Sequence, residues 1–574
     1  MKSKDIPAIR QKADRISEDY ERRFTGEFYT PIEFAEKGVK YLEKTIGKEW
    51  WKTGEYRFWD MAAGTGNLEF MLPEDALQYC YISTLLEDDA KYCNRIFPKA
   101  TCFQYDYLND DVGFLGDSLN LGFQRKMPDN LVRDLQNPNL KWIIFINPPW
   151  ATSNTMGKET GKKSKDSVSK TQIRELMNRD NLGESSRELF TQFLYRISKE
   201  FSNKDANLCI YSKLKYITAK NDKKVRDSFF QYEYKKGFIF SIKHFGGAKG
   251  NFPVGFLIWN LAKHKPINKQ KIEVDVFNQN YEKIGIKQIY DIENNIPITE
   301  WINRPKNTQI MPPFKSAITF AGDNKDVRDR IADNFICSLS NNGNDMQHQN
   351  GCFLLSAPYV SAGAFSVTPD NFEKAMVLHA IKKIPFACWT NDRDQFFTPN
   401  TNNLSQEFIN DCIVWSAFAD SNNCASLKDI EYKGVMYQIQ NSMYPFLLKD
   451  VKKWQHSLSD FTFQLATANE DRFLANWLLK HVLSQEAQKV MDCAKNLYKY
   501  FYKEASNTHW KNYKIDTWDV GFWQIKQALK DINLGESELN LLKTAHKQLG
   551  EKLLPQIYKY GFVYQDVQYF EKND

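Results

Sequence analysis

The apolar run 142–146, followed directly by Asn147-Pro148-Pro149-Trp150, constrains the fold more than any other segment. Its β-branched and aromatic residues have the length of a buried strand. Because neither proline has a backbone N–H, the strand must end there in a rigid turn. Ligands of open α/β sheets bind at the carboxyl ends of the strands. Acceptor oxygens beside an indole at that edge suit a planar ring with an exocyclic amino group. The alternative interpretation of the motif is a Pro-Pro turn without a ligand.

Strand-like runs alternate with helix-like segments between residues 56 and 260, which is the pattern of βαβ units. We therefore expect an α/β fold, a Rossmann-like doubly wound and mostly parallel sheet, followed by a large C-terminal α+β region. Amphipathic helices are expected in that region over 471–496, 525–532 and 536–552. The expected strands are 56–59, 81–86, 101–105, 142–146, 208–211, 238–243 and 255–260.

At 574 residues the chain is too long for one ordinary core. We expect an N-terminal helical arm (1–24), an α/β domain (25–262) and a further region (263–574). The polar, glycine-containing stretch 151–172 is expected to form a mobile loop over the site.

Composition excludes several classes of protein. No apolar run approaches the roughly 18–20 residues that span a bilayer, and the charged N-terminus does not resemble a signal peptide. The 10 cysteines form no Cys-x-x-Cys pair and the 8 histidines show no ligand spacing. We therefore expect a cytoplasmic protein without a metal site or a disulfide framework.

Positive charge is concentrated directly after the Asn-Pro-Pro-Trp turn. Residues 1–150 contain 20 Lys/Arg and 24 Asp/Glu, whereas residues 151–260 contain 21 and 11. A polyanionic substrate would be attracted to such a stretch. A solvated charged loop is the alternative interpretation.

Three further segments carry groups that suit a nucleoside cofactor. The first expected strand ends at Asp60 and continues through Gly64-Thr65-Gly66, and glycines at such a turn let the backbone approach a ligand. The second strand ends at the acidic pair Glu87-Asp88, either of which could accept ribose hydroxyls. The third leads to Asp106, which could receive an adenine amino group. For each acid, a helix-start or turn residue is the alternative.

The segment Thr25-Gly26-Glu27-Phe28-Tyr29-Thr30-Pro31 precedes an amphipathic stretch. We expect Thr30 to be the N-cap of a helix and Pro31 its first residue.

The ordered series resembles the γ class of N6-adenine DNA methyltransferases. It consists of Thr-Gly-x-x-Tyr-Thr-Pro, Asp-x-x-x-Gly-x-Gly, an acidic second strand, a third-strand Asp, Asn-Pro-Pro-Trp, and finally 251–256 (Asn-Phe-Pro-Val-Gly-Phe). The resemblance covers about residues 22–262, which would form a class I methyltransferase domain. It implies S-adenosylmethionine as cofactor and double-stranded DNA as substrate. A cognate restriction endonuclease would be a further partner, and residues 263–574 would recognise the target.

Site residues also follow from the resemblance. Asn147 and the Pro148 carbonyl would hold the target amino group within the catalytic motif Asn147, Pro148, Pro149 and Trp150. Trp150, where this family more often has Tyr or Phe, and Phe252 would stack on the flipped base. The cofactor would contact Thr25, Tyr29, Thr30, Pro31, Asp60, Ala62, Gly64, Gly66, Asn67, Glu87 or Asp88, Asp106 and Asn147.

The resemblance implies direct methyl transfer, without a covalent intermediate or a metal. The adenine amine is a poor nucleophile, and two acceptors on its hydrogens would direct its lone pair at the methyl group. Two rival interpretations remain. One is an enzyme that methylates a glutamine amide of a protein or a guanine amine of RNA, because such enzymes also use Asn-Pro-Pro-aromatic. The other is a non-catalytic DNA-binding subunit of a restriction assembly.

Overall fold

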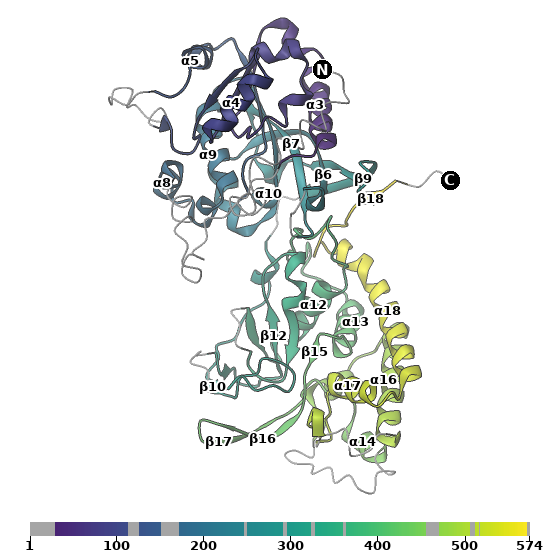
Figure 1. The fold of residues 1–574 in the computed structure, drawn as a ribbon. Coiled ribbons are helices and arrows are strands. Elements are labelled where there is room, and N and C mark those ends of the chain that lie inside the picture. The colour runs from purple at the N-terminus through teal and green to yellow at the C-terminus, as the bar shows by residue number, and fades with distance from the viewer. Residues whose placement is uncertain are drawn as a thin grey trace. The chain divides into compact units, whose positions relative to one another are not determined.

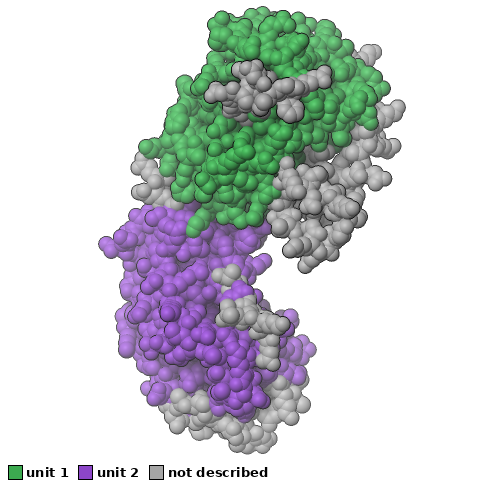
Figure 2. All heavy atoms as spheres, turned by 90° about the vertical axis from the view of Figure 1, so that its left-hand side faces the viewer, with its two compact units in different colours: residues 1–294, 388–394, 565–574 green, residues 295–387, 395–564 purple. Residues whose placement is uncertain are grey.

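The computed structural model describes residues 29–112, 125–150, 171–245, 250–290, 296–322, 328–359, 363–454, 470–504, 511–515 and 517–570. These residues form two compact units (Figure 2). Unit 1 comprises residues 1–294 together with two segments from later in the chain, 388–394 and 565–574. Unit 2 comprises residues 295–387 and 395–564. The expected arm (1–24) and nearly all of the expected loop (151–172) lie outside the described residues.

Unit 1 is built on a ten-stranded sheet with the order β18-β9-β8-β6-β7-β5-β4-β1-β2-β3 (Figure 1). Strands β1 to β5 pair in parallel, whereas β7 runs antiparallel to both β5 and β6. The strands are β1 (Tyr56–Asp60), β2 (Cys80–Thr84), β3 (Thr101–Gln104), β4 (Lys141–Ile146), β5 (Ala206–Lys213), β6 (Tyr232–Ser241), β7 (Pro253–His264), β8 (Ile272–Phe277), β9 (Lys283–Tyr290) and β18 (Gln568–Tyr569).

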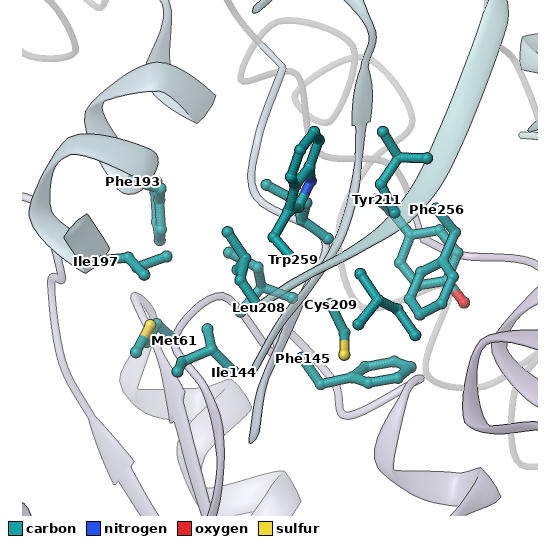
Figure 3. Close-up of a cluster of buried hydrophobic side chains, with 14 of the residues drawn as sticks. Met61, Ile144, Phe145, Phe193, Ile197, Leu208, Cys209, Tyr211, Phe256 and Trp259 are labelled. Atoms are coloured by element: carbon teal, nitrogen blue, oxygen red, sulfur yellow. The ribbon is translucent and has the colours of Figure 1, made fainter. Parts of the chain in front are cut away.

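Helices cover both faces of this sheet. Successive strand residues point to opposite faces, so Ile144 faces α9 while the neighbouring Phe145 faces away from it. Figure 3 shows Phe193 and Ile197 of α9 on one side of these strands and Tyr211 and Phe256 on the other. The helices of unit 1 are α3 (Ile32–Ile46), α4 (Glu87–Ile96), α5 (Asp129–Gln136), α8 (Gln172–Arg179), α9 (Leu189–Phe201), α10 (Lys215–Thr218) and α11 (Lys223–Ser228).

The predicted fold class is confirmed: a Rossmann-like, doubly wound and mostly parallel sheet, with a large α+β region after it. All seven expected strands are present. The second is shorter than expected, because β2 ends at Thr84 and the next two leucines are exposed beyond it.

The sheet extends past the boundary predicted at residue 262. That residue lies inside β7, and β8 and β9 follow within the same sheet. The sequence obscured β8 because residues 271–275 alternate apolar residues with charged ones, as in a strand that buries only one face. Segment 388–394 and β18 also belong to unit 1.

Unit 2 has its own hydrophobic core, formed by a four-stranded sheet with the order β14-β12-β13-β15 and by helices packed against it (Figure 1). The helices are α12 (Phe372–Lys383), α13 (Gln406–Ala417), α14 (Leu448–Trp454), α15 (Phe473–Leu478), α16 (Gln485–Glu504), α17 (Phe522–Asp531) and α18 (Glu536–Lys559). The sheet strands are β12 (Cys337–Asn341), β13 (Cys352–Leu355), β14 (Ala364–Val367) and β15 (Asn422–Asn423), and two small ribbons pair β10 (Gln309–Ile310) with β11 (Arg330–Ile331) and β16 (Leu427–Tyr432) with β17 (Val435–Ile439).

The three amphipathic stretches expected in this region are helical, and the first of them is divided between α15 and α16. Within the described part of the chain, no helix is both long and apolar enough to cross a membrane.

Candidate active site

A cavity of about 370 Å³ opens where β1, β2, β3 and β4 end. These are the carboxyl ends of parallel strands, where ligands of open α/β sheets bind. The structure brings many of the sequence-predicted residues into its wall. They are Tyr29, Thr30, Asp60, Ala62, Gly64, Asn67, Asp106, Asn147 and Pro149.

The turn after β1 forms one side of the cavity. Asp60 Oδ1 accepts a hydrogen bond from the Ala62 backbone N–H at 2.8 Å, which closes the turn. Gly64 has φ +54°, and a Cβ there would lie 3.4 Å from the Tyr29 ring. Glycine therefore suits this backbone conformation and leaves the space beside Tyr29 open. Gly66 has φ +80°, and its missing Cβ makes room for the buried ring of Phe97. Gly66 therefore serves packing beneath the cavity.

Asn67 supplies a test of whether a polar ligand fits. Its side chain lines the cavity and is 6% exposed, and its Oδ1 is buried without a hydrogen-bond partner among the described residues. Because an unsatisfied buried acceptor costs about 1–3 kcal/mol, a ligand amino or hydroxyl group would stabilise this site. The cavity therefore fits a ligand that carries such groups.

Two buried carboxyl groups lie together at the base of this turn. Asp60 and Glu69 are each 1% exposed. Burial raises the pKa of Asp60 to about 7. Burial and the nearby charge of Asp60 raise the pKa of Glu69 well above its usual range. At neutral pH the pair therefore retains a proton. Glu69 could not be predicted from the sequence, because a lone acid in an apolar segment is expected to be exposed.

The acidic residues after β2 differ in their placement. Glu87 and Asp88 are exposed at the start of α4, and both lie near Lys91, at 2.8 and 3.9 Å. Neither lines the cavity, whereas the next residue, Asp89, is buried and does line it. Consecutive side chains of a helix point about 100° apart. The spacing of the motif alone could therefore not show which of the three acids faces the cavity.

The wall after β3 is held by a buried arginine. Asp106 lines the cavity, and its carboxylate accepts from the Leu108 N–H at 3.0 Å and from Asn109 Nδ2 at 2.7 Å. Arg196 of α9 is fully buried and donates to the Tyr105 hydroxyl and the Asp110 carbonyl, each at 2.8 Å. This turn is therefore fixed by α9.

Asn147 is connected to the N-terminal motif. Its Nδ2 donates to Thr30 Oγ1 at 3.0 Å, and both residues line the cavity. The predicted N-cap role of Thr30 is wrong, because α3 begins at Ile32 with Pro31 at the cap position and no side-chain cap bond. The Thr30 hydroxyl instead orients the amide of Asn147. Thr25 lies outside the described residues, and Pro31 and Pro148 do not line the cavity.

The two residues expected to stack on a base lie outside this cavity. Trp150 is 3% exposed and meets the Phe245 ring edge-on at 4.9 Å between centroids. Phe252, just before β7, is half-buried, and the Arg393 guanidinium lies over its ring at 5.0 Å. Their stacking on a base stays a prediction.

No protein-family model and no curated protein match this sequence. Among solved structures, the chain is similar to the type IIL restriction-modification enzyme MmeI in complex with DNA, at 10% identity over 94% of this chain and 81% of that one, with a TM-score of 0.35. A DrdV–DNA complex is similar at 14% identity over 58% and 39% of the chains, with a TM-score of 0.32. The methyltransferase subunit of a type I restriction-modification system from Streptococcus thermophilus is similar at 12% identity over 44% and 47%, with a TM-score of 0.26. This chain thus matches about half of the Streptococcus chain and less than half of DrdV. Similarities at this level do not establish a shared activity.

Proposed function

We propose that this chain is an S-adenosylmethionine-dependent DNA methyltransferase of restriction-modification type, which methylates the N6 amine of adenine as γ-class enzymes do. The observation that carries the proposal is the hydrogen bond from Asn147 to Thr30 at 3.0 Å. It joins the Asn-Pro-Pro-Trp motif to the N-terminal motif at the wall of one cavity, beside the glycine turn after β1.

S-Adenosylmethionine would occupy this cavity and supply an electrophilic methyl group on a sulfonium. Tyr29 and Thr30 would lie toward its methionine part, with Asp60, Ala62, Gly64 and Gly66 forming or supporting the turn beneath it. Asn67, whose buried oxygen has no hydrogen-bond partner within the described parts of the chain, would accept from its amino group. Asp106 would face its adenine.

The ribose ligand requires a choice among three acids. We propose Asp89 over Glu87 and Asp88, because Asp89 alone of the three lines the cavity. A carboxylate can accept from two hydroxyl groups at once. The other two acids lie in solvent beside Lys91.

Asn147 would act on the target amine. With its nitrogen engaged by Thr30, the amide is held in one orientation, so its oxygen can serve as an acceptor. Together with the Pro148 carbonyl, it would take both hydrogens of the adenine amine and turn the lone pair toward the methyl group. Such positioning requires no covalent intermediate.

An adenine in duplex DNA must leave the helix first, which costs a few kcal/mol. Stacking on an aromatic ring returns about 1–3 kcal/mol per base. Phe252 is half-buried and would provide one such face. Trp150 would provide another only if the contacts that now bury it change. Unit 2 would recognise the DNA sequence, and a cognate restriction endonuclease would be a further partner.

The proposal is tested by incubating the chain with labelled S-adenosylmethionine and varied genomic DNA, then locating the label by nucleoside analysis. Label on N6-methyladenine supports it. Label only on protein or RNA, or none at all, overturns it. Asn147→Ala should abolish transfer while S-adenosylmethionine binding, followed by calorimetry, stays within a few-fold. Asn139→Ala, at an exposed asparagine before β4, is the matched control and should behave as wild type.

A further inference from the structure

Segment 388–394 is anchored in unit 1 by a buried ion cluster. Lys287 of β9 has a side chain 2% exposed and contacts Asp394 at 2.6 Å and Asp566 at 2.9 Å. Thr390 Oγ1 also donates to Asp566, at 2.7 Å. The neighbouring Trp389 packs against the core of unit 1. Three stretches of chain are therefore fixed to one another, and Lys287 is 107 residues from Asp394 and 279 residues from Asp566 in sequence.

This anchor places Arg393 beside the predicted base-stacking residue. Arg393 directly precedes Asp394, and its guanidinium lies over the Phe252 ring at 5.0 Å. Arg393 also lies near Asp392, with Nε 3.4 Å from Oδ2, and its side chain is 29% exposed. A guanidinium can stack through its face and still donate hydrogen bonds through its edge. Arg393 can therefore rest on Phe252 and bind an anion at the same time.

A second cation lies close by, at the end of β5, where Lys213 pairs in register with Val254, two residues after Phe252. Lys213 Nζ donates to the Trp150 carbonyl at 3.0 Å, so it is fixed to the catalytic motif. Burial lowers the pKa of Lys213; Glu188 raises it, and the charges of Lys215 and Arg393 lower it further. Lys215 is itself paired with Glu188 at 2.8 Å. Lys213 and Arg393 are thus like charges near one another, and Lys213 is largely desolvated. A bound anion would relieve both the repulsion and the desolvation.

We propose that Arg393 and Lys213 bind a DNA phosphate next to the flipped nucleotide, so that segment 388–394 is part of the target-nucleotide site. This inference rests on the proposed function, because it takes Trp150 and Phe252 as the neighbours of the target base. A phosphodiester fits the charge, and each cation contacts one of the two proposed stacking residues, Arg393 the ring of Phe252 and Lys213 the carbonyl of Trp150. In this role Arg393 is a positioning residue, which holds the DNA strand that carries the target base.

The test compares wild type with Arg393→Gln, which removes the charge, and Arg393→Lys, which keeps it. The measured quantity is the salt dependence of kcat/KM for labelling genomic DNA. Each phosphate contact contributes about 0.9 to the slope of log K against log salt concentration. Arg393→Gln should therefore lower the slope by about one and raise the KM for DNA about tenfold. Arg393→Lys should restore the slope, and S-adenosylmethionine affinity should not change in either variant.

Lys141→Gln is the matched control. Lys141 begins β4, at the opposite edge of the sheet from Asn147, and is paired with Glu55. It should leave the slope unchanged. If Arg393→Gln keeps the wild-type slope, or if Arg393→Lys resembles Arg393→Gln, the side chain acts through packing on Phe252 and the phosphate site is overturned. If wild type labels no adenine, the proposed function and this inference fail together.

Discussion

The buried pair Asp60 and Glu69 should make unit 1 less stable as pH rises, and Asp60→Asn should remove much of this dependence. The pKa of Asp60 is raised by burial from 3.8 to about 7. At pH values between 3.8 and about 7, the Asp60 carboxyl is ionised in the unfolded chain and protonated in the folded chain. The folded state then binds more protons, so the free energy of unfolding falls as pH rises through this window. The stabilisation is complete below about pH 3.8 and is lost above about pH 7.

The magnitude follows from the size of the shift. About three pKa units at 1.36 kcal/mol each correspond to roughly 4 kcal/mol, as an upper limit for Asp60 alone. Asn is nearly isosteric, and its oxygen can still accept from the Ala62 N–H that Asp60 now binds. We therefore expect Asp60→Asn to be more stable than wild type at pH 8, by up to about 4 kcal/mol, and similar to it near pH 4.

The assay must report on unit 1 alone, because the chain has two units. Hydrogen exchange of peptides from β1, compared between variant and wild type at each pH, does this, since intrinsic exchange rates cancel. Asp75→Asn changes an exposed carboxyl near the same strand and is the control. Parallel curves for Asp60→Asn and wild type from about pH 4 to pH 8 would refute the reasoning, because Asp60 would then ionise at its ordinary pKa.

Two further predictions concern the cavity wall. Thr30→Val should lower the single-turnover methylation rate about tenfold, because the Asn147 amide loses its hydrogen-bond partner. Thr30→Ser keeps the hydroxyl and should keep most of the rate. Equal rates in wild type and both variants would contradict the orienting role of Thr30. Asp89→Asn should weaken S-adenosylmethionine binding about tenfold in a calorimetric titration, whereas Glu87→Gln should not; the reverse ranking would return the ribose to Glu87.

The sheet could be predicted from sequence because each of its main strands is a short apolar run with local boundaries. The run before Asn147 is buried from Trp142 to Ile146, as its continuous hydrophobicity indicates. Prediction is weaker where a strand buries only one face. In β8 charged and apolar residues alternate, so the sequence places it in the following region.

Side-chain roles were harder to predict than strands, because they depend on contacts between distant residues. Thr30 precedes a helix and has the chemistry of an N-cap, yet its hydroxyl is used by Asn147, 117 residues later. At the start of α4, three consecutive acids share the same chemistry, and only the helical geometry separates the buried Asp89 from the other two. The sequence motifs predict the edge of the sheet at which the cavity lies. They do not predict which side chains line the cavity.

Much of the wall of this site consists of turns, and buried cations fix these turns by hydrogen bonds and ion pairs. Arg196 reaches from α9 to the turn after β3, and Lys287 ties two late segments to β9. The Arg196 charge is paired with Glu200 of the same helix at 2.8 Å, and its other N–H groups donate to the turn after β3. Those acceptors therefore gain their buried donor only when α9 packs on the sheet. The cavity wall after β3 therefore forms together with the packing of α9 on the sheet. A chain that carried the same motifs without these cations would keep the residue types of the site and lose their placement.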